Sequence, residues 1–182
     1  MRSLYFRWLP NFITIGRFVL TPAAIDMIVT ENWPAAFGVF VLAGASDALD
    51  GWLAKRFDLR TELGALLDPL ADKALIVSIY ATLALVGVLP SWLALLVISR
   101  DVLIIGAVAV SWLLQRRIDL SPLPVSKATT AAQLALAALV LATRAFAFPL
   151  DEAVLTLSVA VSALTVVSAA VYLWRWIRNM GP

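Results

Sequence analysis

Four aspartates lie within otherwise apolar segments in the first half of the chain, and their spacing is helical. Asp47 and Asp50 are three positions apart, and Asp68 and Asp72 are four positions apart. Residues at these separations share one face of an α-helix, so each pair places two carboxylates side by side. A short basic segment joins the two pairs, beginning with Lys55. Two antiparallel helices joined in this way would bring all four carboxylates together.

A divalent cation is the best partner for such a cluster. The chain contains no histidine and no cysteine, so imidazole and thiolate ligands are absent. Four unpaired carboxylates in a membrane would cost roughly 10 kcal/mol, at about 2.5–3.5 kcal/mol each. Oxygen ligands suit Mg²⁺, Mn²⁺ or Ca²⁺, and two ions about 4 Å apart form the arrangement used in phosphoryl transfer. The alternative is that each aspartate caps a helix or pairs with a basic residue of the loop, which explains one aspartate better than four.

Composition places these aspartates in a membrane. Of 182 residues, 62% are hydrophobic and 14% are charged, and the mean hydropathy is +0.93. Soluble domains carry about 25% charged residues, so a soluble globular protein, a disordered chain and a nucleic-acid binder are excluded. Helical spans need about 20 residues each, so six would use about two thirds of the chain. We expect an all-α integral membrane bundle forming a single domain over residues 1–182.

The apolar segments are separated by clear turn signals. Residues 1–10 have a basic start and bulky apolar groups, which are typical of a short interfacial helix, and we expect this segment to be retained rather than cleaved. The expected transmembrane helices are Phe12–Thr30, Pro34–Ala54, Gly64–Val88, Ser91–Leu114, Val125–Phe146 and Ala153–Ile177.

Basic residues indicate the orientation. With six spans, one face of the membrane carries Arg2, Arg7, Lys55, Arg56, Arg60, Arg116, Arg117, Lys127, Arg175 and Arg178. The other face carries only Arg144 among basic residues, beside three acidic ones. The positive-inside rule therefore predicts that both termini and the aspartate cluster are cytoplasmic, in what we expect to be a bacterial inner membrane.

The aspartate region resembles the signature of the CDP-alcohol phosphotransferases. That family carries Asp-x-x-Asp-Gly-x-x-Ala-Arg, then eight residues, then Gly-x-x-x-Asp-x-x-x-Asp. The matching positions here are Asp47, Asp50, Gly51, Ala54, Lys55, Gly64, Asp68 and Asp72. One position departs, because Lys55 stands where the family has arginine, and Arg56 follows it directly. The six-span plan is similar too, so the likeness covers most of the chain.

The resemblance implies a function and roles for these residues. The family transfers a phosphatidyl group from a CDP-linked lipid such as CDP-diacylglycerol to an alcohol, with release of CMP. Asp47, Asp50, Asp68 and Asp72 would then hold two Mg²⁺ or Mn²⁺ ions, and Asp72 would also act as general base on the acceptor hydroxyl. The residues expected near the CDP group are Gly51, Ala54, Lys55 and Gly64. The resemblance also implies a homodimer.

Other segments bear on the acceptor. Residues 10–17 resemble the opening of the glycerol-phospholipid branch, and residues 98–102 and 125–133 look closer to its cardiolipin-synthase type than to its phosphatidylglycerolphosphate-synthase type. Phosphatidylglycerol is thus the expected acceptor, with glycerol 3-phosphate as the alternative. Arg100, inside the fourth span, and Lys127, at the start of the fifth, are candidate ligands for an acceptor phosphate. The alternative is a structural role in place of acceptor binding: an ion pair for Arg100 and a membrane anchor for Lys127.

Other classes of membrane protein use intramembrane carboxylates. A cation transporter would place them near the midplane, beside broken helices and within an inverted repeat, whereas here they cluster at one end and no repeat is visible. An intramembrane prenyltransferase would need more spans and a different aspartate spacing. A purely structural membrane protein would not need the cluster.

Overall fold

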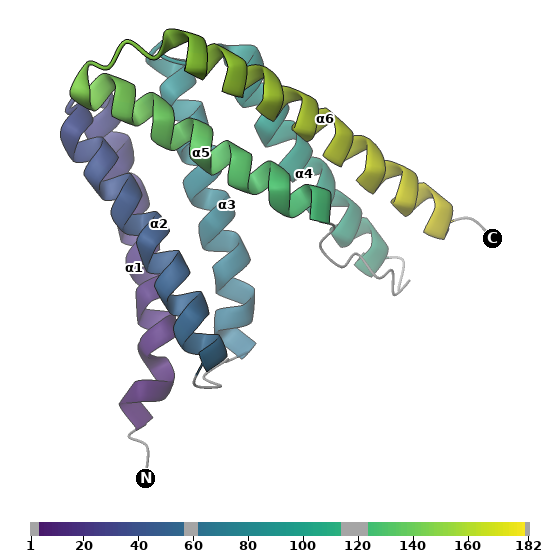
Figure 1. Ribbon diagram of the computed structural model, residues 1–182. Helices are drawn as coiled ribbons and strands as arrows, with labels where there is room; N and C mark the ends of the chain where they lie inside the picture. Colours follow the sequence, from purple (N-terminus) through teal and green to yellow (C-terminus); the bar gives the residue numbers. More distant parts are fainter. Residues whose placement is uncertain (1–3, 57–61, 114–123, 181–182) are drawn as a thin grey trace.

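The computed structural model describes residues 4–56, 62–113 and 124–180, and all its regular structure is helical. The six helices, shown in Figure 1, are α1 (Leu4–Val29), α2 (Trp33–Arg56), α3 (Glu62–Leu85), α4 (Ser91–Leu113), α5 (Pro124–Phe146) and α6 (Asp151–Met180). No strand occurs in these ranges. The predicted all-α class and the six-helix plan are confirmed.

The helices are long enough to cross a bilayer. They contain 23 to 30 residues each, against the roughly 20 that a span needs. By length and composition together, three of the described helices qualify as spans, namely Ser91–Ser111, Pro124–Phe146 and Asp151–Arg178. Large apolar side chains such as Leu85, Leu95 and Leu113 point outward and are well exposed. This is expected of a bundle whose outer surface meets lipid rather than water.

Several predicted boundaries differ from the structure by a few residues, and two of the differences have an identifiable physical cause. The interfacial helix expected over residues 1–10 is not separate, because α1 runs without a break from Leu4 to Val29. Pro10 removes one intrahelical hydrogen bond without ending the helix. The third span, expected to reach Val88, is helical only to Leu85.

Gly87 explains the early end of α3. Its φ is 73°, a left-handed conformation that glycine adopts without a steric penalty. The Val88 amide donates to the Leu83 carbonyl at 2.9 Å, and the Gly87 amide donates to the Ala84 carbonyl at 3.1 Å. These two bonds form a Schellman cap, which satisfies the last carbonyls of the helix.

Successive helices run antiparallel to one another (Figure 1). The start of α1 and the end of α6 consequently lie toward the same side of the bundle, as an even number of spans requires. Toward that side, α1, α2 and α3 diverge from α4, α5 and α6 in Figure 1. At the opposite side, buried residues from all six helices pack together, including Ile28, Phe40, Ile79, Leu93 and Leu141. The packed core thus holds one end of the bundle, and the aspartate segments lie toward the other end.

Candidate active site

A buried arginine joins the two aspartate helices. Arg17 of α1 is only 1% exposed. Its Nη1 lies 2.9 Å from Oδ1 of Asp47 on α2, and the same nitrogen donates to Oδ1 of Asp72 on α3. The carboxylate side chains are 44% and 41% exposed, so both are accessible to a ligand. The structure therefore brings one aspartate of each predicted pair to a common point.

These three polar residues lie on the wall of a cavity of about 120 Å³. Helices α1, α2, α3 and α5 all contribute to it. Its lining residues are Arg17, Ala43, Gly44, Asp47, Asp72, Leu75, Ile76, Thr130 and Leu134. The charged groups are thus gathered at one part of a cavity whose other walls are mainly apolar.

The other motif residues lie on the same two helices. Asp50, Gly51, Ala54 and Lys55 belong to the last turns of α2, and Gly64 and Asp68 belong to the first turns of α3. Their side chains are outside the described part of the structure. Helical register places Asp50 on the face of α2 that carries Asp47, and Asp68 on the face of α3 that carries Asp72.

The donor set at this point suits a hard divalent cation. Among the described side chains, no group of three acidic, histidine or cysteine residues forms a metal cluster. However, the Oδ1 atoms of Asp47 and Asp72 already share one positively charged nitrogen. Two carboxylate oxygens that meet at one cationic centre, with no sulfur or imidazole nearby, fit Mg²⁺ or Mn²⁺.

A second polar network lies one residue further along α3. Lys73 Nζ donates to Oδ1 of Asp101 on α4 at 2.6 Å, and Arg100 Nη1 donates to the same oxygen at 2.6 Å. Arg100 Nη2 donates to Ser126 Oγ on α5 and, at 3.0 Å, to Ser168 Oγ on α6. Four helices are thereby linked through two cations and one carboxylate.

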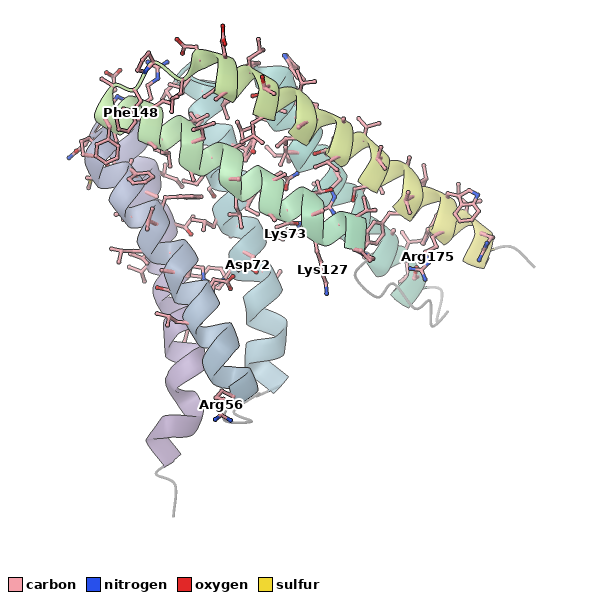
Figure 2. All side chains as sticks on the ribbon, viewed as in Figure 1. Arg56, Asp72, Lys73, Lys127, Phe148 and Arg175 are labelled. Carbon is pink, nitrogen blue, oxygen red and sulfur yellow. The ribbon has the colours of Figure 1, made fainter. Side chains whose placement is uncertain are left out.

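The network shows where the two candidate acceptor ligands lie. Arg100 is 2% exposed and forms an ion pair with Asp101, which is not one of the four motif aspartates. Lys127 is exposed, and Figure 2 shows it projecting from the first turn of α5, away from the packed core. Its neighbour Ser126 accepts a hydrogen bond from Arg100, so the buried Arg100 and the exposed Lys127 lie in adjoining parts of the molecule.

Sequence reasoning left two of these residues out of the candidate site. Asp101 had a recognisable signal, because a carboxylate within a span is costly and marks a partner or a function. Arg17 had the same signal within the first span. Asp101 pairs with its sequence neighbour Arg100 and with the distant Lys73, whereas both partners of Arg17 named above are far away in sequence, so spacing alone did not identify these distant contacts.

Comparison with known proteins gives the family. The family model described as CDP-alcohol phosphatidyltransferase matches residues 7–174. A human protein named cardiolipin synthase (CMP-forming) is 43% identical over 101 residues, covering 55% of this chain and 34% of its own length. A Schizosaccharomyces pombe cardiolipin synthase (CMP-forming) / mitochondrial hydrolase fusion protein is 33% identical over 181 residues, covering 90% of this chain and 30% of its own.

A rice relative carries a different name. The chloroplastic CDP-diacylglycerol–glycerol-3-phosphate 3-phosphatidyltransferase 1 is 43% identical over 98 residues, covering 54% of this chain and 30% of its own length. The chain spans about a third of the length of these three relatives. The family match covers nearly all of the residues that build the helices and the site, and it confirms the predicted family. The chain belongs to the CDP-alcohol phosphatidyltransferase family.

Proposed function

We propose that this protein transfers the phosphatidyl group of CDP-diacylglycerol to the hydroxyl of phosphatidylglycerol, releasing CMP and forming cardiolipin. The observation that carries the proposal is the meeting of Asp47 and Asp72 at one cationic centre on a cavity wall, within a chain of this family. The name of the human relative, cardiolipin synthase (CMP-forming), supports the choice of acceptor.

Divalent cations are part of the proposal. Asp47, Asp50, Asp68 and Asp72 would hold two Mg²⁺ or Mn²⁺ ions, since the donor set fits these metals. When bound, such ions neutralise the negative charge of a pyrophosphate and stabilise the leaving phosphate. In a low-dielectric site this electrostatic contribution is large.

Asp72 is the proposed general base. Its carboxylate is accessible, and the chain has no histidine to take the proton instead. The carboxylate accepts the proton of the acceptor hydroxyl as the hydroxyl oxygen forms a bond to the phosphorus atom of the phosphatidyl group. The bond between that phosphorus and the bridging oxygen of the pyrophosphate breaks, and CMP leaves with the electron pair.

The remaining motif residues are assigned to the substrates. Gly51, Ala54, Lys55 and Gly64 are proposed to contact the CDP group at the facing ends of α2 and α3. Arg100 and Lys127 are proposed to attract the phosphate of an anionic acceptor. The exposed position of Lys127 supports direct contact, whereas the buried Arg100 would act from within its network with Asp101.

Orientation and assembly complete the proposal. Arg56 and Arg175 lie toward the side of the bundle that holds the termini, and Phe148 lies at the other side (Figure 2). This arrangement supports a cytoplasmic location for both termini and for the site, in a bacterial inner membrane. A homodimer is proposed from the family likeness.

Glycerol 3-phosphate is the second candidate acceptor, because the rice relative is named for that reaction. The test is to supply the purified protein with CDP-diacylglycerol, Mn²⁺ and either phosphatidylglycerol or glycerol 3-phosphate, and to identify the lipid by mass spectrometry. Cardiolipin in the first reaction and no new lipid in the second is expected. Phosphatidylglycerolphosphate in the second reaction alone would transfer the assignment to the other acceptor.

A further inference from the structure

Thr130 lines the candidate active-site cavity from a helix that carries none of the signature aspartates. The cavity is lined by Asp47 from α2 and Asp72 from α3, and α5 contributes Thr130 and Leu134. These two α5 residues are four positions apart, so they lie on one face of the helix. Helix α5 therefore adds one hydroxyl and one apolar side chain to the wall of the cavity.

Neighbouring polar residues fix the rotation of α5. Thr129 is fully buried, and its hydroxyl donates to the Leu164 carbonyl of α6 at 3.2 Å. Gln133, one turn later, is also fully buried and donates through Nε2 to Thr165 Oγ1 of α6 at 3.3 Å. Adjacent residues of a helix point about 100° apart. Because Thr129 is held toward α6, Thr130 is directed away from it and onto the cavity wall.

The Thr130 hydroxyl makes no hydrogen bond with any residue that the structure describes. Threonine in a helix commonly donates to the carbonyl one turn earlier, as Thr21, Thr82 and Thr165 do here. Thr130 is partly buried, and a hydroxyl in apolar surroundings is unfavourable until it gains a partner. This hydroxyl is therefore available to a ligand in the cavity.

Lys127 indicates which substrate the hydroxyl would meet. Lys127 precedes Thr130 by three residues, so both lie toward one side of α5. Lys127 is the proposed contact for the acceptor's phosphate, and Figure 2 shows it projecting from the first turn of the helix. Thr130 is about 4.5 Å further along the helix axis, on the cavity that Asp72 also lines. An acceptor held by its phosphate at Lys127 would extend its alcohol end past Thr130 toward Asp72.

We propose that Thr130 recognises the second hydroxyl of the acceptor's glycerol group. Phosphatidylglycerol and glycerol 3-phosphate each carry two adjacent hydroxyls, of which one attacks the phosphatidyl phosphorus and gives its proton to Asp72. The other donates a hydrogen bond to Oγ1 of Thr130 and thereby orients the attacking hydroxyl. The inference rests on the proposed function and holds for either acceptor, because both contain this glycerol group.

A purely structural role for Thr130 predicts a different result. If the residue only packed α5 against the other helices, its replacement would slow the reaction with every acceptor by the same factor. If it binds the second hydroxyl, replacement affects only acceptors that carry this hydroxyl, since a site built to bind a hydroxyl rejects the analogue that lacks it. Comparing two acceptors therefore separates the two roles.

The experiment compares each acceptor with an analogue that lacks the second hydroxyl. Phosphatidylglycerol is paired with phosphatidyl-1,3-propanediol, and glycerol 3-phosphate is paired with 3-hydroxypropyl phosphate. The ratio of kcat/KM within each pair is measured at saturating CDP-diacylglycerol and Mn²⁺. For the unaltered chain we expect the glycerol acceptor to be preferred about five- to tenfold, the scale of one hydrogen bond. In Thr130→Val, which removes the hydroxyl and keeps the β-branched shape, this preference should disappear.

Two further variants and a binding measurement serve as controls. Thr130→Ser keeps a hydroxyl, so it should retain most of the preference. Thr129→Val removes the neighbouring hydroxyl, which bonds to α6 instead, so it should lower the midpoint of thermal unfolding and leave the preference unchanged. The affinity for CDP-diacylglycerol, measured at saturating Mn²⁺ without acceptor, should be the same in Thr130→Val as in the unaltered chain.

The outcomes separate this inference from the proposed function. If the unaltered chain forms no lipid product from either acceptor, the proposed function fails and the role of Thr130 fails with it. If it forms product but shows no preference for the second hydroxyl, or Thr130→Val keeps the full preference, only the role of Thr130 is overturned. A loss of CDP-diacylglycerol affinity in Thr130→Val would also overturn it, since the hydroxyl would then serve the donor lipid.

Discussion

Asp47 and Asp72 contact the same nitrogen atom, Nη1 of Arg17, from two different helices. The next residue of α3, Lys73, pairs on another side with Asp101 of α4. Successive residues of an α-helix point about 100° apart, so α3 presents a carboxylate to α1 and α2 and an ammonium to α4. This single helix thereby connects the proposed metal site to the buried network around Arg100.

Metal dependence follows from the donor set at Asp47 and Asp72. We expect EDTA to abolish CMP release from CDP-diacylglycerol, and added Mg²⁺ or Mn²⁺ to restore it. The carboxylates and the pyrophosphate are both negatively charged, so a cation is needed to hold them together. CMP is measured by liquid chromatography before and after metal is added back. Full turnover in chelator-treated, metal-free buffer would contradict the two-metal proposal.

The four motif aspartates should differ in what their loss does. Asn at Asp47, Asp50 or Asp68 removes a proposed ligand, so Mn²⁺ affinity and CDP-diacylglycerol affinity should both fall. Asn at Asp72 preserves size but cannot accept the proton, and losing general-base assistance costs about 10²–10⁴-fold in rate. Asp72→Asn should therefore lose turnover while retaining much of its lipid affinity. Binding and CMP release are measured for all four variants.

A matched control for these variants is Asp26→Asn, since Asp26 is an exposed residue of α1 that is not part of the signature. It should retain both binding and turnover. If Asp72→Asn keeps near-normal turnover while another variant binds normally and fails to react, then the general base is that other residue.

Asp101 should be important for stability. It carries the negative charge that pairs with both Lys73 and Arg100, and it is 1% exposed. Removing one partner of a buried ion pair typically costs about 3–5 kcal/mol, because charge is left buried without compensation. Asp101→Asn should thus lower the midpoint of thermal unfolding in detergent by several degrees or more.

The comparison for Asp101 is Asp151→Asn, which alters an exposed aspartate in the first turn of α6. Its unfolding midpoint should stay close to that of the unaltered chain. Equal midpoints for the two variants would show that the network around Arg100 does not stabilise the bundle.

The orientation of the bundle can be tested with a reporter. An alkaline phosphatase fused after residue 182 should be inactive, and a fluorescent protein fused there should be bright, because the positive-inside rule places the C-terminus in the cytoplasm. Active phosphatase at that position would overturn either the even number of spans or the assigned direction.

Much of the fold was predictable because it depends on local sequence. The apolar segments and turn signals predicted six helices. The spacing of Asp47 from Asp50, and of Asp72 from Asp68, predicted which faces of the two helices meet. The end of α3 was misplaced because a glycine cap at Gly87 was not recognised within an apolar run. Pro10 was taken as a boundary, although one proline does not end a helix that is otherwise favourable.

The contacts of Arg17 and Asp101 were not predictable in the same way. Arg17 is a single charge in an apolar span, and its contacts with Asp47 and Asp72 depend on which helices become neighbours in three dimensions. Asp101 has Arg100 beside it in the sequence, but its contact with Lys73 depends on the packing of α3 against α4. Spacing rules describe one helix face at a time, so they identified the aspartate pairs and not the cation between them.

The most direct test of the central claim is the stoichiometry of the reaction. Purified protein is incubated with CDP-diacylglycerol, phosphatidylglycerol and Mn²⁺, and CMP and cardiolipin are quantified in the same sample. Phosphatidyl transfer at the site of Asp47 and Asp72 predicts equal amounts of the two products, and neither product from an Asp47→Asn, Asp72→Asn double variant. CMP without a phosphatidyl-transfer product, or undiminished product from the double variant, would contradict it.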